Sequence, residues 1–127
     1  MKITPILTVD RIEVSLPFWV DRMGFEKTVE MPDGDRLGFV ILTRNGSELM
    51  LQTAATIQKD EPKFAPSDTG TRASLYIEVD DFADTTKRLN GYPIAMPQRD
   101  TFYGMREVGL FEPSGHIVIF GARTPKT

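Results

Sequence analysis

Two stretches of the chain, separated by about seventy residues, share one pattern of apolar and polar positions. Ile3–Asp10 and Ala73–Asp80 both carry apolar side chains at alternate positions, and both end in Val-Asp. Alternation with a period of two residues is typical of a β-strand that buries one face. Each stretch therefore predicts a strand that leads directly into a helix.

A helical pattern follows the first of these strands. Its apolar stripe consists of four residues at steps of four and three: Ile12, Leu16, Trp19 and Met23. Gly24 can adopt the left-handed conformation that ends a helix. Pro17 lacks an amide donor, so we expect the helix to be regular only from about Ser15. The stripe predicts that Trp19 packs in the core.

The second strand is followed by a shorter helical pattern. Its inner face consists of Phe82, Thr86 and Leu89. Asp80 or Asp81 can accept hydrogen bonds from the first free amides, and Gly91 can end the helix. The pattern therefore predicts an amphipathic helix at the same place in both halves of the chain.

Three further strand-like runs follow each helix. They are Glu26–Met31, Leu37–Thr43 and Glu48–Thr53 in the first half, and Pro93–Pro97, Met105–Phe111 and His116–Gly121 in the second half. Asn45-Gly46 and Pro113-Ser114-Gly115 are turn signals at corresponding places. The sequence therefore predicts the order strand, helix, strand, strand, strand, repeated once.

The repeat predicts a single domain over residues 1–127, made of module 1 (1–53), a linker (54–72) and module 2 (73–121). Modules of about 55 residues bury too little apolar surface to be stable alone. We therefore expect them to pack on each other or on a partner chain. The polar linker predicts either a crossover or an ordered lid.

The composition narrows the class of protein. Of the 127 residues, 40% are hydrophobic and 26% are charged, which is typical of a globular domain. A net charge of -3, with no basic run longer than a pair, argues against nucleic acid as a partner. The first ten residues hold no apolar signal region, and no stretch is long and apolar enough for a membrane span. Together with the lack of cysteine, this predicts a cytoplasmic protein.

Few catalytic devices are compatible with this composition. The only histidine is His116, next to the Pro113-Ser114-Gly115 turn, and we expect it to face solvent. A histidine-based catalytic triad is therefore disfavoured. A metal site built from several imidazoles is excluded, because there is only one histidine. No phosphate-binding glycine motif is present. We assign no catalytic residue.

Four segments together carry a family resemblance. They are Val9–Trp19 ending at Met23-Gly24-Phe25, then Ile77–Asp81, Tyr103–Glu107 and Phe111–His116. In this order they resemble the vicinal oxygen chelate superfamily, which contains glyoxalases, bleomycin-resistance proteins and extradiol dioxygenases. The resemblance implies an α+β fold, the glyoxalase/bleomycin-resistance fold, in which two βαβββ modules with curled mixed sheets form a cup. It also implies a homodimer, with modules commonly paired across the two chains.

The period of two indicates which side chains line such a cup. Leu49, Leu51, Val108, Leu110, Val118 and Phe120 are expected to face the helices. The alternate positions and the loop before Met105 supply the candidate ligand-binding residues. These are Thr4, Thr8, Met50, Gln52, Ser74, Tyr76, Glu78, Phe102, Tyr103, Met105 and Glu107. A plainer interpretation makes Glu48 and Glu107 surface groups paired with Arg106, Arg36 or Arg99.

The resemblance also identifies the positions at which metal-dependent members hold their ion. They correspond here to Thr4, Met50 (or Gln52 after a shift of two residues), Ser74 and Ile119. A divalent cation needs several oxygen or nitrogen donors that converge. Ile119 and Met50 supply none, so we expect no metal and no cofactor.

The leading hypothesis is a metal-free protein that binds a small molecule, similar to the bleomycin-resistance proteins. Glu78 and Glu107 would suit a cationic drug or metabolite. One alternative is a metal-dependent lyase, isomerase or dioxygenase with the atypical ligands Glu78, Glu107 and Gln52. Another is an interaction module that has kept the fold and lost its ligand.

Overall fold

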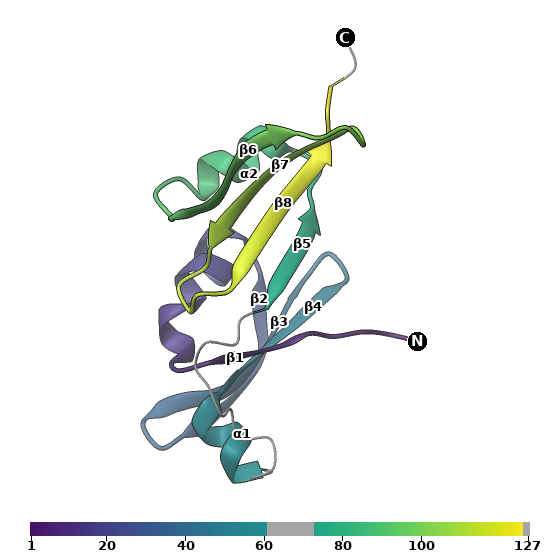
Figure 1. Ribbon diagram of the computed structural model, residues 1–127. Helices are drawn as coiled ribbons and strands as arrows, with labels where there is room; N and C mark the ends of the chain where they lie inside the picture. Colours follow the sequence, from purple (N-terminus) through teal and green to yellow (C-terminus); the bar gives the residue numbers. More distant parts are fainter. Residues whose placement is uncertain (61–72, 126–127) are drawn as a thin grey trace. The chain divides into compact units, whose positions relative to one another are not determined.

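The computed structural model describes residues 1–60 and 73–125. The chain divides into two compact units, Met1–Thr71 (unit 1) and Arg72–Thr127 (unit 2), and each is described by itself (Figure 1). Within the described residues, no helix is long and apolar enough to cross a membrane.

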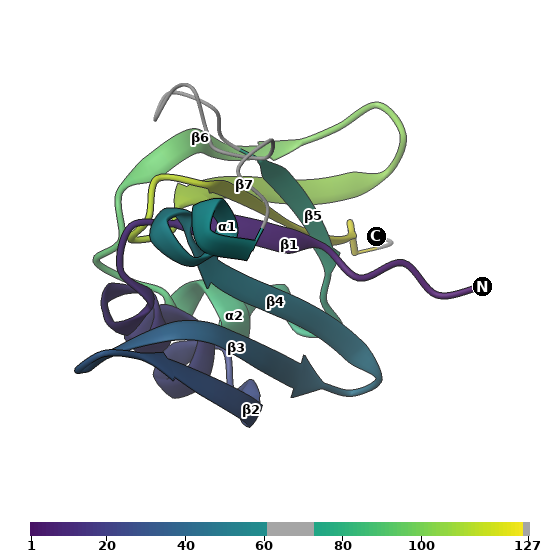
Figure 2. The same cartoon turned by 90° about the horizontal axis from the view of Figure 1, so that it is seen from below.

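Unit 1 is a four-stranded sheet with helical turns. Its elements are β1 (Ile6–Val9), η1 (Ile12–Val14), η2 (Pro17–Arg22), β2 (Glu26–Asp33), β3 (Arg36–Arg44), β4 (Ser47–Thr53) and α1 (Ala54–Asp60). The strand order is β1-β4-β3-β2, and only the pair of β1 and β4 is parallel. Figure 2 shows β1 beside β4, and β4 beside β3.

Unit 2 repeats this topology. Its elements are β5 (Ser74–Glu78), α2 (Phe82–Arg88), β6 (Ile94–Asp100), β7 (Met105–Phe111) and β8 (Ile117–Arg123). The order β5-β8-β7-β6 again pairs the first strand with the last in parallel and the others antiparallel. The α+β fold and its two βαβββ modules are therefore confirmed, whereas a cup enclosed jointly by the two sheets stays a prediction.

The side of each sheet that meets the helical turns carries the core, as the alternation predicts. In β4, β7 and β8 the six apolar side chains expected there are all buried: Leu49, Leu51, Val108, Leu110, Val118 and Phe120. The opposite side, here called the open face, carries the alternate residues. In β5, for example, Tyr76 and Glu78 are exposed while Leu75 and Ile77 are half-buried.

The first helix differs from the regular helix expected from Ser15. A short 3-10 turn precedes a π-helical segment in which the Met23 amide donates to the Phe18 carbonyl five residues back. Pro17 begins this segment, and having no amide it donates no bond there. The wider turn buries Phe18 and Trp19 together, with ring centroids 5.0 Å apart, whereas ideal spacing selected Trp19 alone.

The second helix and the predicted turns are confirmed. The Asp81 carboxylate caps α2 by accepting from the Asp84 amide at 3.0 Å. Asn45 and Gly46 have φ of 50° and 80°, the left-handed pair that a two-residue hairpin turn needs.

The predicted linker begins with a helix, α1, which follows β4 directly. At its start the Thr53 hydroxyl accepts from the Thr56 amide at 3.2 Å, and the Thr56 hydroxyl donates to the Gly38 carbonyl at 3.0 Å. The rest of the linker, residues 61–72, and any lid formed there lie outside the described residues.

Candidate functional site

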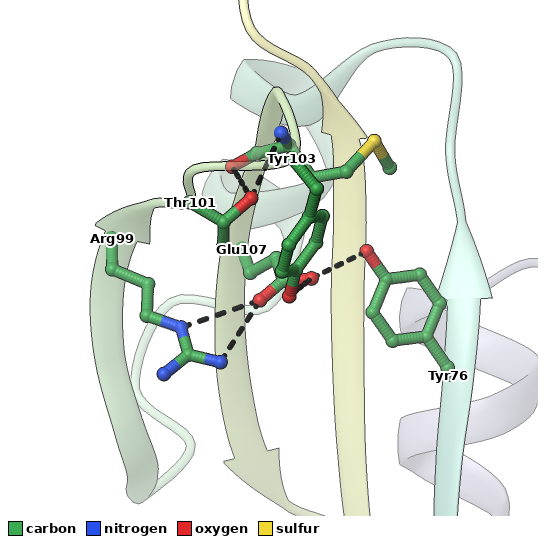
Figure 3. Close-up of polar contacts among 6 residues, drawn as sticks. Tyr76, Arg99, Thr101, Tyr103 and Glu107 are labelled. Carbon is green, nitrogen blue, oxygen red and sulfur yellow. Dashed lines mark hydrogen bonds and ion pairs between the residues drawn. The ribbon is translucent and has the colours of Figure 1, made fainter.

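A buried carboxylate lies in the open face of unit 2 (Figure 3). Glu107, in the middle of β7, is only 1% exposed. The hydroxyls of Tyr76 and Tyr103 donate to its Oε2 at 2.7 and 2.8 Å. Arg99 donates to its Oε1 from Nε at 3.3 Å and from Nη2 at 3.2 Å. We call these four residues the Glu107 cluster.

A glycine allows Tyr76 to reach Glu107 across the sheet. Tyr76 pairs with Ile119 of β8, whereas Glu107 pairs with Gly121 of the same strand. The Tyr76 side chain therefore passes diagonally over Gly121. A Cβ atom at Gly121 would overlap the Tyr76 hydroxyl, so any side chain there would displace the phenol.

A β-bulge places Arg99 beside Glu107. Met96 of β6 pairs with Gly109 of β7, and regular pairing would set Gln98 opposite Glu107. The register shifts between Met96 and Arg99, so Arg99 becomes the partner instead. Pro97 lies within this irregular stretch on an edge strand, where the lack of an amide is tolerated.

The loop between β6 and β7 holds Tyr103 over the sheet. The Thr101 hydroxyl accepts from the Met105 amide at 3.0 Å and donates to the Met105 carbonyl at 3.1 Å. Gly104 takes φ of 82°, which closes the turn. Phe102 is 99% exposed at the loop and meets the Tyr103 ring edge-on, with centroids 5.1 Å apart.

The hydrogen bonds of the cluster keep the Glu107 carboxylate deprotonated and the Tyr76 hydroxyl protonated. The hydrogen bond from Tyr76, followed by those from Tyr103 and Arg99, lowers the pKa of Glu107 below 4.5 despite the opposing effect of burial. Desolvation and the hydrogen bond to Glu107 raise the pKa of Tyr76 from 10.0 to about 12. At neutral pH Glu107 is therefore an anion and Tyr76 a neutral phenol.

The structure brings three of the predicted residues of unit 2 into direct contact: Tyr76, Tyr103 and Glu107. Glu78 lies in the same row of the sheet, on the far side of Gly121, and Met105 anchors the loop through its backbone. Ser74 is exposed at the start of β5, and the Phe102 ring has no polar atom with which to hydrogen-bond the cluster. Their part in binding a ligand stays a prediction.

The predicted residues of unit 1 have other partners. Thr4 donates to Glu48 at 3.3 Å, and Glu48 also pairs with Lys2 at 3.0 Å. Gln52 donates to Asp60 of α1 at 3.1 Å. Thr8 pairs with Gln52, and Met50 with Ile6, along the parallel strands β1 and β4.

Two expectations about charged or polar side chains are wrong. Glu107 does pair with Arg99, but it is buried rather than a surface group. His116 does not face solvent: it is 3% exposed, and its Nδ1 accepts from the Ala73 amide at 3.0 Å. Glu112, also buried, accepts from the His116 amide, so this turn is held by side chains whose role is structural.

The sequence interpretation did not include Arg99 in the site. Regular alternation along β6 would place Gln98, and not Arg99, opposite Glu107. Only the bulge brings Arg99 to that position. Pro97 inside a strand-like run was the available signal, since proline is found at bulges of edge strands.

The donor atoms do not fit the metal ion implied by the resemblance. Thr4 and Ser74 offer hydroxyls, Met50 a thioether and Ile119 only methyl and methylene groups, a set unlike that of hard divalent cations. Over residues 1–60 and 73–125 no three His, Cys, Asp or Glu side chains are grouped to hold an ion. The atypical set fares no better, since Gln52 donates to Asp60 and both Glu107 oxygens already accept bonds.

Comparison with solved structures shows the same fold. TioX from Micromonospora sp. ML1 matches with 19% identity and a TM-score of 0.77, over 97% of this chain and 98% of that one. Bleomycin-binding protein from Streptomyces verticillus, solved with copper(II)-bleomycin, matches with 23% identity and a TM-score of 0.61, over 99% and 97%. Lactoylglutathione lyase from Agrobacterium tumefaciens matches with 17% identity and a TM-score of 0.73, over 96% and 92%.

A search of curated proteins finds no significant match. The family model described as Glyoxalase/Bleomycin resistance protein/Dioxygenase superfamily, in contrast, matches residues 2–120, which is nearly the whole chain. The repeated βαβββ topology, the turn motifs and this match agree, and the chain belongs to the glyoxalase/bleomycin resistance protein/dioxygenase superfamily.

Proposed function

We propose that the chain binds a small organic molecule on the open face of unit 2, without a metal ion. The Glu107 cluster carries this proposal, because a carboxylate 1% exposed orients two phenols that are each 50% exposed. Ligand sites combine apolar surface with a few fixed polar groups whose outer atoms stay accessible. Ile119 and Met96, beside Tyr76 and Gly109 in the same row, supply apolar surface.

A binding role has a precedent among proteins of this fold. Bleomycin-binding protein from Streptomyces verticillus was solved in complex with copper(II)-bleomycin, and it resembles this chain over nearly its whole length. Because one fold hosts many functions, the resemblance supports the type of role and leaves the ligand open. Sequestration of a small molecule is therefore the function that we propose.

Metal-dependent catalysis has less support. The fold is shared with a lactoylglutathione lyase, yet the donor set described above does not suit a divalent cation. Metal-free catalysis by Glu107 as a general base is also disfavoured, because hydrogen bonds lower the pKa of Glu107 and occupy both of its oxygens. We therefore assign no catalytic residue.

We further propose that the working form is a homodimer. The edge strands β2 and β6 expose apolar side chains, among them Met31 and Ile94 at 56% and 62%. Each module alone buries little surface, so a second chain would add to the core. Light scattering after size exclusion tests this, with a mass of twice 14.3 kDa expected and a monomer contradicting it.

The binding proposal is tested by a thermal-shift screen of cationic antibiotics, 2-oxo aldehydes, catechols and aromatic acids, each with and without EDTA. A ligand that binds the folded state raises the melting temperature. We expect at least one compound to do so equally in EDTA, to stabilise Glu48→Gln normally and to lose its effect on Glu107→Gln. A hit that EDTA abolishes, or a stoichiometric transition metal in the purified protein, would contradict the proposal.

A further inference from the structure

The Glu107 carboxylate has no remaining capacity for a ligand. An ionised carboxylate offers about four lone-pair positions. Tyr76 and Tyr103 occupy two of them on Oε2, and Arg99 occupies two on Oε1. Glu107 therefore acts as a positioning residue, which holds its three partners and does not itself receive a cationic ligand.

The partners of Glu107 do have remaining capacity. The Arg99 side chain is 55% exposed and bonds Glu107 through Nε and Nη2, which leaves the N–H groups of Nη1 for another acceptor. Tyr76 and Tyr103 spend their hydroxyl protons on Glu107 and are each 50% exposed. The accessible polar groups are thus a guanidinium donor and two phenolic acceptors.

The charged side chains of this face sum to zero, so no net negative charge opposes an anion at Arg99. The negative charge of Glu107 is neutralised by the positive charge of Arg99. Arg123, which lies opposite Met105 in the strand register, adds an exposed positive group to the same face. Glu78 is the second negative group of this row, and it lies on β5, two strands away from β7, whereas Arg99 lies on β6. A guanidinium recognises a carboxylate with directional, charge-assisted hydrogen bonds.

We infer that the ligand of this site carries a carboxylate on a flat apolar body, and that Arg99 binds the carboxylate. This inference rests on the proposed binding function and names its ligand class. The exposed rings of Phe102 and Tyr103 lie edge-on at 5.1 Å beside the site and give the apolar body an aromatic surface. The inference replaces the cationic ligand expected from sequence, which relied on Glu78 and on Glu107 as available acceptors.

The test uses three probes that share one ring system: 2-naphthoate, 2-naphthylmethanol and 2-naphthylmethylammonium. Affinities are measured by isothermal titration at neutral pH and low salt, with EDTA present. We expect 2-naphthoate to bind on the order of tenfold more tightly than the alcohol, with the ammonium weakest. Arg99→Gln should remove this preference, and Arg99→Lys should reduce it because the planar fork is lost.

Arg106→Gln is the matched control. Arg106 is a neighbouring arginine that also pairs with a carboxylate, Asp100, but the alternation of β7 places it on the other side of the sheet from Glu107. The Arg106→Gln variant should therefore keep the full preference for 2-naphthoate, although it loses one positive charge just as Arg99→Gln does. Melting temperatures of all variants establish that each is folded.

The outcomes separate this inference from the proposed function. A preference for 2-naphthoate that Arg99→Gln retains, or equal binding of the three probes, overturns the inference and leaves a metal-free binding site in place. Tightest binding of the ammonium, weakened by Glu78→Gln, overturns it in favour of a cationic ligand. Failure of all three probes overturns the ligand class, while the broader screen described above decides the binding function.

Discussion

The open faces of the two sheets differ although their strand order is the same and three of the four strands share one register. Superposing the pairings β1–β4 and β5–β8 makes Ile6 equivalent to Tyr76, and Gln52 equivalent to Gly121. Through the next strand, Phe39 is equivalent to Glu107. In unit 2 these positions hold the phenol of Tyr76, the carboxylate of Glu107 and the glycine that the phenol crosses. In unit 1 they hold the apolar side chains of Ile6 and Phe39 and the amide of Gln52, which donates to Asp60.

The comparison shows how little is needed to make a site on this scaffold. The backbone frame is shared, so the polar cluster of unit 2 depends on side chains at three equivalent positions and on one bulge in β6. Gly121 is also required, because a side chain there would occupy the path of Tyr76. The proposed function thus depends on side chains placed on a fold that both units share.

The largest expected effect tests what the units have in common. Leu51 and Phe120 are equivalent, and both are 0% exposed on the helical side of their sheets. Truncation to alanine should cost about 2–5 kcal/mol for Leu51 and about 3–5 kcal/mol for Phe120, because each leaves a cavity. Urea denaturation measures both, and a loss of less than about 1 kcal/mol at either position would mean that its core packing is wrongly described.

The next effect tests what distinguishes unit 2. Glu107→Gln replaces the anion by an amide whose NH2 group faces either Arg99 or the two phenols, so one side of the cluster loses its acceptor and ligand affinity should fall on the order of tenfold or more. Glu48→Gln, on the open face of unit 1, should leave affinity unchanged. Titration calorimetry with one hit from the screen measures both, and equal losses would remove the distinction between the faces.

Gly121→Ala should disturb the same cluster without removing a polar group. The new Cβ atom would displace the Tyr76 hydroxyl from Glu107, so the pKa of Tyr76 should fall from about 12 toward 10.0. Ultraviolet titration of the three tyrosines follows this change, and Tyr76→Phe identifies which transition belongs to Tyr76. An unchanged titration in Gly121→Ala would show that Tyr76 does not cross the glycine.

The cluster also predicts a dependence of stability on pH at both extremes. Since the folded pKa of Glu107 lies below 4.5, its stabilising contribution is present above that pH and is lost as pH falls through the folded value. Since the folded pKa of Tyr76 is raised from 10.0 to about 12, its contribution is present below pH 10 and is lost as pH rises through about 12. Urea midpoints across pH should show the acid loss in the wild type and a smaller one in Glu107→Gln; identical acid profiles would refute the assignment.

The smallest effect concerns the surface pair of unit 1. Lys2 is 65% exposed where it meets Glu48, and exposed ion pairs contribute less than about 1 kcal/mol. Lys2→Ala should therefore change the free energy of unfolding by less than this amount. A larger loss would mean that the open face of unit 1 has a stabilising polar cluster of its own.

The sequence was sufficient for the topology because the signals were local and occurred twice. Alternating strands, the Asp81 cap and the Asn45-Gly46 turn each act over a few residues, and the repeat placed them in register. The first helix was predicted less well. Pro17 was recognised as a disturbance, but the pattern did not reveal that a wider turn would bury Phe18 beside Trp19.

The site was only partly predictable, for a physical reason. Period-two alternation placed Tyr76 and Glu107 on one face, but alternation does not describe how far a side chain reaches along the sheet. Arg99 depended on a bulge that shifts parity, and His116 accepts from the amide of Ala73, which is distant in the sequence. Contacts between segments that are distant in the sequence cannot be predicted from the local pattern of apolar and polar residues.

The central claim is that the open face of unit 2 holds a small molecule through the Glu107 cluster without a metal ion. The most direct measurement is an amide ¹H–¹⁵N NMR titration of the chain with a hit from the screen, in the presence of EDTA. We predict chemical-shift changes centred on Tyr76, Arg99, Tyr103 and Gly121, with the equivalent positions Ile6 and Gln52 unaffected. Shifts centred on unit 1, or shifts that appear only when EDTA is omitted, would contradict the claim.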